Sequence, residues 1–126
     1  MYKEYGDVFF LTHFPESTSP FWNMKLGAMD VKKENKLANK CDVIMGGMET
    51  IGSAERATDV QEMKEQFYTI SDGEYAKLLF DLFGKDRVEL ELFKFLSHKF
   101  VPRYGGGIGI TRLISAMKRA GLIVDD

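Results

Sequence analysis

The chain has 126 residues, which is enough for one domain and too few for two. Hydrophobic residues make up 44% and charged residues 29% of it, a composition typical of folded soluble domains and unlike that of disordered chains. The 17 basic and 19 acidic residues nearly balance. This argues against a dedicated binder of nucleic acids or anionic membranes, because such proteins carry an excess of Lys and Arg.

The cysteine content and the hydropathy of the chain argue against a disulfide-bonded, zinc-binding or membrane-spanning protein. Cys41 is the single cysteine, so no internal disulfide can form, and the two histidines do not complete a zinc pattern. No apolar run has the length of a membrane span, and the first residues do not resemble a signal peptide. We therefore expect a soluble protein of the reducing cytoplasm.

The first third of the chain predicts strands and turns. The apolar and β-branched run 7–12 predicts a strand that ends at Pro15. Residues 16–22 include Ser, Thr and Pro and predict a loop, and the polar segment 29–40 predicts an exposed loop. Two glycines, Gly46 and Gly47, then predict a hairpin turn between strands at about 41–45 and 48–54, because both central residues of such a turn need positive φ.

The middle of the chain predicts helices. Thr58 and Gln61 form a capping box for a helix to about Tyr68, and Ser71 and Glu74 form a second box for a helix over 74–83 that ends at Gly84. Residues 86–92 fit either a third helix or an alternating strand. A last helix is predicted over 111–120.

The glycine-rich segment 105–110 is the first candidate binding site. It lacks the dinucleotide fingerprint, because its sixth position is isoleucine instead of glycine. Gly105, Gly107 and Gly109 alternate, which leaves one strand face bare for a flat ligand. Arg112, in the first turn of the following helix, could present its guanidinium to a phosphate. The alternative is a tight bend beside a solvated arginine.

The hairpin provides the second candidate. With the two glycines as the turn, Ile44 pairs with Glu49 and Asp42 with Ile51, so the two carboxylates are diagonal neighbours on one sheet face. Such a pair suits Mg²⁺, which prefers oxygen ligands, although both carboxylates could instead be solvated.

Arg56 continues the second strand of the hairpin. Strict alternation places it on the face opposite Glu49. It joins the carboxylates only if Gly52 and Ser53 form a β-bulge, which glycine permits. The sequence leaves both arrangements open.

These features together resemble the C-terminal part of the catalytic domain of class II aminoacyl-tRNA synthetases. Segment 105–114 resembles the third signature of that class. The resemblance implies that Arg112 acts on the ATP triphosphate and that Gly105, Gly107 and Gly109 belong to the same ATP site. Segment 42–49 resembles one whose two acids are associated with magnesium and ATP, which implies that Asp42 and Glu49 are the metal ligands.

The amino-acid site is implied in the same way. Segment 49–56, followed by Asp59, resembles the strand whose arginine reads the amino acid, which implies that Arg56, with Ser53 beside it, binds the substrate. Phe14-Pro15 and segment 19–22 resemble the strand and loop that precede it. The likeness is nearest to the aspartyl, asparaginyl and lysyl group and is weak over about 68–100.

Two departures bear on the function. The family usually has an acidic residue before the final arginine, where this chain has Thr111; ammonia-dependent asparagine synthetases, which are relatives, are similar in having a small hydroxyl residue there. Nothing resembles the first two signatures or an anticodon-binding domain. The resemblance thus implies that residues 1–126 form a single domain, the C-terminal portion of such a catalytic domain.

The expected fold is α+β: a partial antiparallel sheet of the class II synthetase type with flanking helices. Half a sheet leaves an unpaired edge and an uncovered apolar surface, so we expect a homo-oligomer or association with an N-terminal half. Three functions stay open. They are a part of a ligase that activates aspartate or asparagine as an acyl-adenylate for tRNA, an ammonia-dependent asparagine synthetase, and a non-catalytic nucleotide-binding or regulatory relative. Contact with tRNA, or with a membrane, is not expected from this chain itself, and neither is the full reaction.

Overall fold

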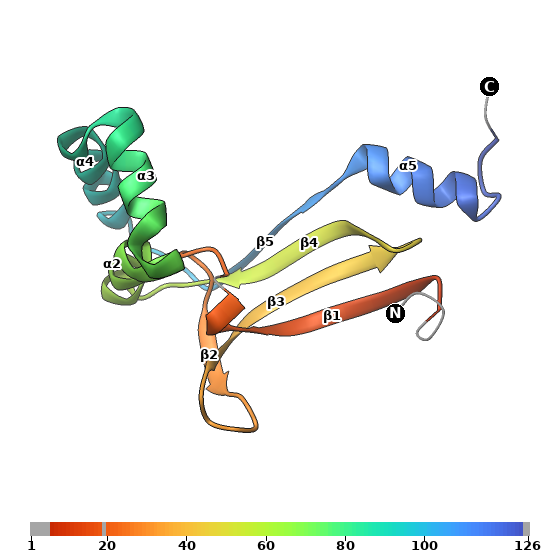
Figure 1. Ribbon diagram of the computed structural model, residues 1–126, viewed down its shortest axis with the longest axis horizontal. Coiled ribbons are helices and arrows are strands. Elements are labelled where there is room, and N and C mark those ends of the chain that lie inside the picture. The colour runs from red at the N-terminus through yellow and green to blue at the C-terminus, as the bar shows by residue number, and fades with distance from the viewer. Residues whose placement is uncertain (1–5, 19, 125–126) are drawn as a thin grey trace.

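The computed structural model describes residues 6–18 and 20–124. An antiparallel sheet occupies its middle, three helices gather at one end of the sheet, and a separate helix lies at the other end (Figure 1). The expected α+β class with a partial antiparallel sheet is confirmed. Residues 1–5, on which the expectation about a signal peptide rests, and Ser19 lie outside the described part.

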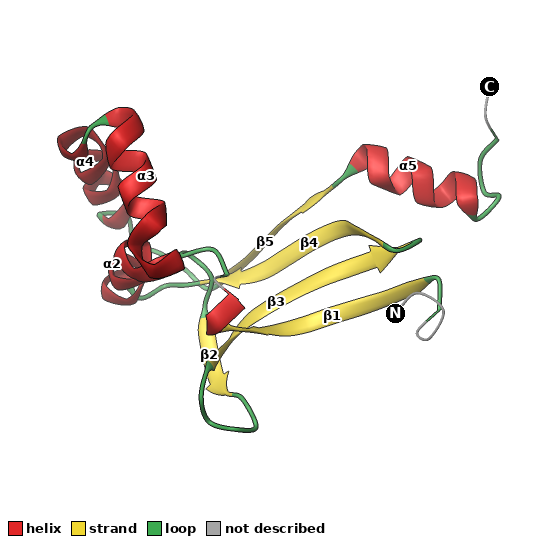
Figure 2. Ribbon diagram, in the orientation of Figure 1, coloured by secondary structure: helices red, strands yellow, loops and turns green. Residues whose placement is uncertain are grey.

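The sheet is built from five strands, drawn in yellow in Figure 2. Their order is β1-β3-β4-β5, every pairing is antiparallel, and β2 also pairs with β3. The strands are β1 (Val8–Pro15), β2 (Leu26–Met29), β3 (Lys36–Met45), β4 (Met48–Arg56) and β5 (Arg103–Ile108). Among the described residues β5 has no second neighbour, so it is an edge of the sheet.

The prediction of an exposed loop over 29–40 is wrong for its second half. Residues 36–40 begin β3, which lies between β1 on one side and β2 and β4 on the other: Ala38 pairs with both Phe14 of β1 and Leu26 of β2. Pairing on both sides satisfies the backbone there, and Ala38 is fully buried. The polar side chains of this segment therefore belong to a central strand.

The β3–β4 hairpin turns at Gly46 and Gly47, which have the predicted positive φ of 57° and 80°. The predicted pairing of Asp42 with Ile51 is wrong, because the register shifts by one residue and Asp42 pairs with Gly52. Thr50 is the extra residue of this bulge; it is buried, and its hydroxyl donates to the carbonyl of Met48 at 3.2 Å.

The α-helices match the predicted segments, although two of their caps differ, and one 3₁₀ turn, η1 (Glu16–Thr18), lies in the segment 16–22 that the sequence predicts as a loop. The other helical elements are α2 (Val60–Thr69), η2 (Ile70–Gly73), α3 (Glu74–Phe83), α4 (Lys85–Leu96) and α5 (Ile110–Arg119). Asp59, and not Thr58, caps α2 by accepting the Glu62 N–H at 2.7 Å. Ser71 has a left-handed φ of 52° and caps nothing, and Gly73 precedes α3 instead. Gly84 ends α3 as predicted. Residues 86–92, for which the sequence left helix and strand open, lie in helix α4.

An aromatic core joins the helices to the loop before β2. Phe67 is buried in this core and makes edge-to-face contacts with Trp22 and Tyr75. Trp22 also meets Phe95 edge-on. Such ring pairs add to the free energy of burial, so α2 to α4 and the Trp22 loop form one packed unit. In the described ranges no helix is long and apolar enough to cross a membrane.

The chain exposes more surface than a compact monomer of its size. Its accessible surface is 8840 Å², whereas a compact monomer of 14.4 kDa exposes about 6,800 Å². Part of the excess is apolar: Phe10, Val43, Ile51 and Ile108 form a row across β1, β3, β4 and β5. The outer members of this row, Phe10 and Ile108, are 65% and 53% exposed.

Candidate functional site

The two predicted metal ligands lie together on the sheet face opposite the apolar row. Asp42 and Glu49 both reach over Gly52, where a Cβ atom would lie 2.8 Å from Glu49 Oε1 and 3.4 Å from Asp42 Oδ1. Asp42 is only 6% exposed, and its Oδ1 atom is buried without a hydrogen-bond partner in the described part of the chain. The missing side chain of Gly52 therefore leaves space for two carboxylate oxygens.

This arrangement fits a magnesium ion. Asp42 Oδ1 and Glu49 Oε1 face the same small space, and the unpartnered Oδ1 lacks the compensation that a buried carboxylate oxygen requires. Magnesium is commonly held by one or two carboxylates while water and substrate phosphates complete its coordination. The described residues contain no cluster of three or more His, Cys, Asp or Glu side chains that could hold a metal ion.

The bulge at Thr50 also decides where Arg56 lies. Because the extra residue shifts the register, Arg56 falls on the same face as Asp42 and Glu49. The sequence required a bulge at Gly52 and Ser53 for this, and the structure places it two residues earlier. The Arg56 guanidinium lies against Gly105, and its Nη1 lies 3.5 Å from Asn23 Oδ1.

The alternating glycines of β5 are covered to different extents. A Cβ atom at Gly105 would lie 2.9 Å from Arg56 Nε, so Arg56 fills that position. At Gly107, which pairs with Gly52, a Cβ would meet nothing within 4 Å. The side-chain stem of Arg112 lies beside Gly109, 3.5 Å from where a Cβ would be. The bare strip predicted from the sequence is thus an open patch at Gly107 between two arginines.

Helix α5 positions Arg112 beside the backbone of Glu49. The N–H of Gly109 donates to the Thr50 carbonyl at 2.8 Å, which fixes the start of the helix against the bulge. Arg112 Nη1 donates to the backbone carbonyl of Glu49 at 2.9 Å, and the side chain is otherwise exposed. A guanidinium held by one of its donors keeps others for an anion.

Ser53 does not join this group. It pairs with Cys41 and Gly106 on the opposite face of the sheet, where its hydroxyl donates to the Cys41 carbonyl at 3.3 Å. The expectation that Ser53 contacts the amino acid together with Arg56 is corrected accordingly, since neighbouring residues of a strand point to opposite faces.

Two residues of the site were missed by the sequence analysis. Lys40 contacts Asp42 Oδ2 as an ion pair, and Asn23 contacts Arg56. The sequence predicts an exposed loop at Lys40, although the spacing of two residues between Lys40 and Asp42 puts both on the same face once that segment is a strand. No sequence signal points to Asn23, because a loop brings it to the end of β4.

A polar network on the opposite face has a structural role. The Glu55 carboxylate accepts hydrogen bonds from Asn39 at 2.8 Å and from Lys25 at 3.0 Å. The Asn39 bond and then the Lys25 bond hold the pKa of Glu55 below its usual value. The hydrogen bond to Glu55 raises the pKa of Lys25.

The lowered pKa of Glu55 predicts an acid-sensitive contribution to stability. A carboxylate with a depressed folded-state pKa stabilises the fold above its unfolded pKa, and that contribution is lost as the pH falls through the folded value. As the pH falls from about 6 to about 3, we expect the free energy of unfolding to decrease less in Glu55→Gln than in the wild type, measured by urea denaturation. Equal slopes for the variant and the wild type would contradict this role. Glu65→Gln on the exposed face of α2 is the control.

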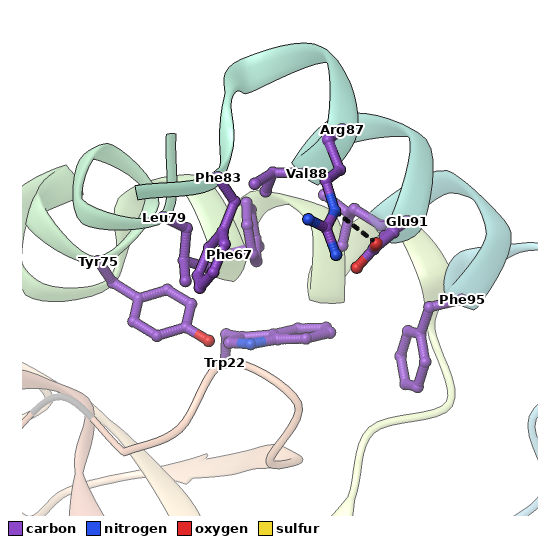
Figure 3. Close-up of a pocket in the computed structure, with 10 residues that line it drawn as sticks. Trp22, Phe67, Tyr75, Leu79, Phe83, Arg87, Val88, Glu91 and Phe95 are labelled. Atoms are coloured by element: carbon purple, nitrogen blue, oxygen red, sulfur yellow. Dashed lines mark hydrogen bonds and ion pairs between the residues drawn. The ribbon is translucent and has the colours of Figure 1, made fainter. Parts of the chain in front are cut away.

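An apolar pocket beside the aromatic core lies away from these residues. It has a volume of about 360 Å³ and opens between Trp22 and helices α3 and α4 (Figure 3). Its walls are mainly aromatic and aliphatic, with the Arg87–Glu91 ion pair on one side. It is a gap in the aromatic core, whereas the carboxylates and arginines lie on the sheet.

Solved structures share this fold. The chain aligns with an aspartyl-tRNA synthetase from Entamoeba histolytica at a TM-score of 0.57 and 21% identity, covering 90% of this chain and 20% of that one. An asparaginyl-tRNA synthetase from Pyrococcus horikoshii, solved in complex with asparaginyl-adenylate, aligns at a TM-score of 0.58 and 21% identity, covering 89% of this chain and 22% of that one. The chain therefore shares the fold of a part of these two synthetases.

The sequence comparisons define the family. The family model "tRNA synthetases class II (D, K and N)" matches residues 1–125. An aspartate–tRNA(Asp) ligase from Pyrobaculum aerophilum is 26% identical over 121 residues, which are 91% of this chain and 22% of the relative. This chain belongs to the class II tRNA synthetase family of the D, K and N group. It spans about a fifth of the length of the relatives it matches.

Proposed function

We propose that this chain is the C-terminal part of a cytoplasmic ligase that activates aspartate or asparagine with ATP, as an acyl-adenylate for transfer to tRNA. The observation that carries the proposal is the grouping of Asp42, Glu49, Arg56 and Arg112 around the open patch at Gly107. Family membership agrees with this function. Contact with tRNA would come from a part of the parent protein outside this chain.

The two arginines and the two carboxylates have different binding roles, which follow from where each side chain lies. Arg112, at the start of α5, binds the terminal phosphates of ATP, and the bare backbone at Gly107 lets the nucleotide lie against β5. Arg56, held at Gly105 and Asn23, binds the carboxylate of the amino acid. Asp42 and Glu49 would hold Mg²⁺, which supplies charge neutralisation at the phosphates. Acceleration would come from positioning and electrostatics instead of covalent catalysis.

The excess surface supports the proposal that a partner completes the sheet. The chain exposes about 2,000 Å² more than a compact monomer of its mass, and a standard interface buries about 800 Å² on each partner. The apolar row and the unpaired edge at β5 are the described surfaces that need cover. A second copy of the chain, or an N-terminal half with the missing signatures, would provide it.

One observation favours an alternative function. Thr111 lies directly before Arg112 in the first turn of α5 and is exposed, where the family usually has an acidic residue. An ammonia-dependent asparagine synthetase would use the same adenylate chemistry without tRNA. Formation of asparagine from ammonia, ATP and aspartate by the full-length parent would favour this alternative. A non-catalytic nucleotide-binding relative would bind ATP and form no adenylate.

Calorimetric titration of the purified chain with ATP, with and without Mg²⁺, tests the nucleotide site. We expect binding that requires Mg²⁺ and weakens about tenfold or more in Asp42→Ala and in Arg112→Ala, because each removes a charged contact worth roughly 1.5–3 kcal/mol. Arg87→Ala is the matched control, since Arg87 lies on α4 and pairs with Glu91. Binding that survives both site substitutions would contradict the proposal.

A further inference from the structure

Lys40 lies where it must influence any cation held by Asp42. Its ammonium contacts Asp42 Oδ2, and both residues are on the same face of β3, two positions apart. The Lys40 side chain is 19% exposed and the Asp42 side chain 8%, so solvent screens this ion pair much less than a surface pair. The contact is therefore part of the site, although neither the family match nor the residue pattern assigns Lys40 a role.

A second contact holds the ammonium in place. The Lys40 Nζ atom lies 4.0 Å from the centroid of the Phe14 ring, which comes from β1. A cation over an aromatic face is attracted by the ring electrons, and more strongly where water is excluded. Lys40 is thus fixed between Phe14 and Asp42, so its charge does not simply move away when another cation arrives.

The two oxygens of Asp42 consequently have different surroundings. Oδ2 forms the ion pair with Lys40. Oδ1 is buried and has no hydrogen-bond partner among the described residues. Together with Glu49 Oε1, it faces Gly52. One oxygen of Asp42 therefore remains for a divalent ion. That ion would lie within a few ångströms of the fixed Lys40 charge, which repels it.

We propose that Lys40 is a positioning residue that acts as an internal counter-ion of Asp42: it orients the carboxylate so that Oδ1 faces Glu49, and it lowers the affinity of the site for a divalent cation. Lys40, Arg56 and Arg112 bring three positive charges to this face against two carboxylates, so the face without a metal ion favours anions. The inference rests on the proposed magnesium role of Asp42 and Glu49.

Titration of the purified chain with MnCl₂, without nucleotide, tests the proposal by calorimetry and by the electron paramagnetic resonance of free Mn²⁺. Mn²⁺ takes the same oxygen ligands. We expect Lys40→Met, which keeps the apolar stem against Phe14, to lower the Kd for Mn²⁺ about tenfold, the size left for one nearby charge after solvent screening. Lys40→Arg keeps the charge and should match the wild type.

Controls separate the role of Lys40 from general charge effects. Lys36→Met removes an exposed charge from the same strand and should leave the Kd unchanged. Adding Asp42→Asn to Lys40→Met should abolish the gain. Lys40→Gln provides a second neutral variant if the methionine variant does not give a wild-type circular dichroism spectrum and melt.

Three results would overturn the inference: equal Kd values for the wild type and both neutral variants, a gain that persists with Asp42→Asn, or no saturable Mn²⁺ binding in any of them. These outcomes are distinct from failure of the proposed function. A chain that shows the Lys40 effect but does not bind ATP keeps the cation site and loses the ligase assignment.

Discussion

Replacing Gly106 by alanine is expected to lower the free energy of unfolding by about 1–3 kcal/mol, through overpacking between β4 and β5. A Cβ atom at this position would lie 2.7 Å from the Gly52 carbonyl oxygen and 2.9 Å from Ser53 Cβ. The first of these is backbone, so the strands themselves would have to separate. Since β5 is an edge strand, the separation would displace the start of α5 as well. Urea denaturation followed by circular dichroism measures the loss.

The neighbouring glycine provides the matched comparison. A Cβ atom at Gly107 meets nothing within 4 Å, and its φ is not positive, so Gly107→Ala should stabilise the chain by about 0.4–1 kcal/mol. The added methyl group would lie on the open patch, and ATP binding should weaken about tenfold. The two adjacent substitutions are thus expected to change stability in opposite directions. Equal stability changes would contradict the close approach of β4 and β5 at Gly106.

The isolated chain is expected to sediment above its monomer mass of 14.4 kDa, and Phe10→Glu combined with Ile108→Glu is expected to return it to that mass. These residues are the exposed ends of the apolar row, and a buried charge there would oppose association. Phe93→Glu is the control, because Phe93 is 70% exposed but lies on α4, away from the row. Sedimentation velocity over a range of concentrations measures the change.

Other results would assign the surface differently. If the wild-type chain is monomeric and unfolds cooperatively on heating, the apolar row does not require a partner for the chain to be stable. Association that the Phe93 substitution removes, and the double substitution does not, would place the interface on the helices. If adding an N-terminal half replaces self-association by a complex of one chain with one N-terminal half, that half is the partner.

The local signals in the sequence were sufficient for most elements because they depend on neighbouring residues. Gly46 and Gly47 need only each other to specify a tight turn, and the helix over 74–83 ends where Gly84 adopts positive φ. Residues 36–40 could not be assigned in this way. Their polar side chains resemble a loop, and only pairing on both sides of β3 makes them strand.

The composition of the site depended on one bulge that the sequence does not specify uniquely. Gly52 was the expected position because glycine tolerates such geometry, but the extra residue is Thr50, which is buried and bonded to its own strand. That shift puts Arg56 with the carboxylates and leaves Ser53 on the other face. A register shift of one residue moves every later side chain of the strand to the opposite face of the sheet. Site residues beyond the bulge were therefore the least predictable.

Helix α5 is attached to the β3–β4 hairpin at both of its ends. Arg112 donates to the Glu49 carbonyl at 2.9 Å near the start of the helix, and Arg119 donates to the Gly46 carbonyl at 2.7 Å in its last turn. Two anchors along one axis prevent the helix from pivoting about either of them. If the sheet twists when a ligand or partner binds, the helix and the hairpin therefore move together as one rigid unit, and the spacing between Arg112 and Glu49 is preserved throughout the movement.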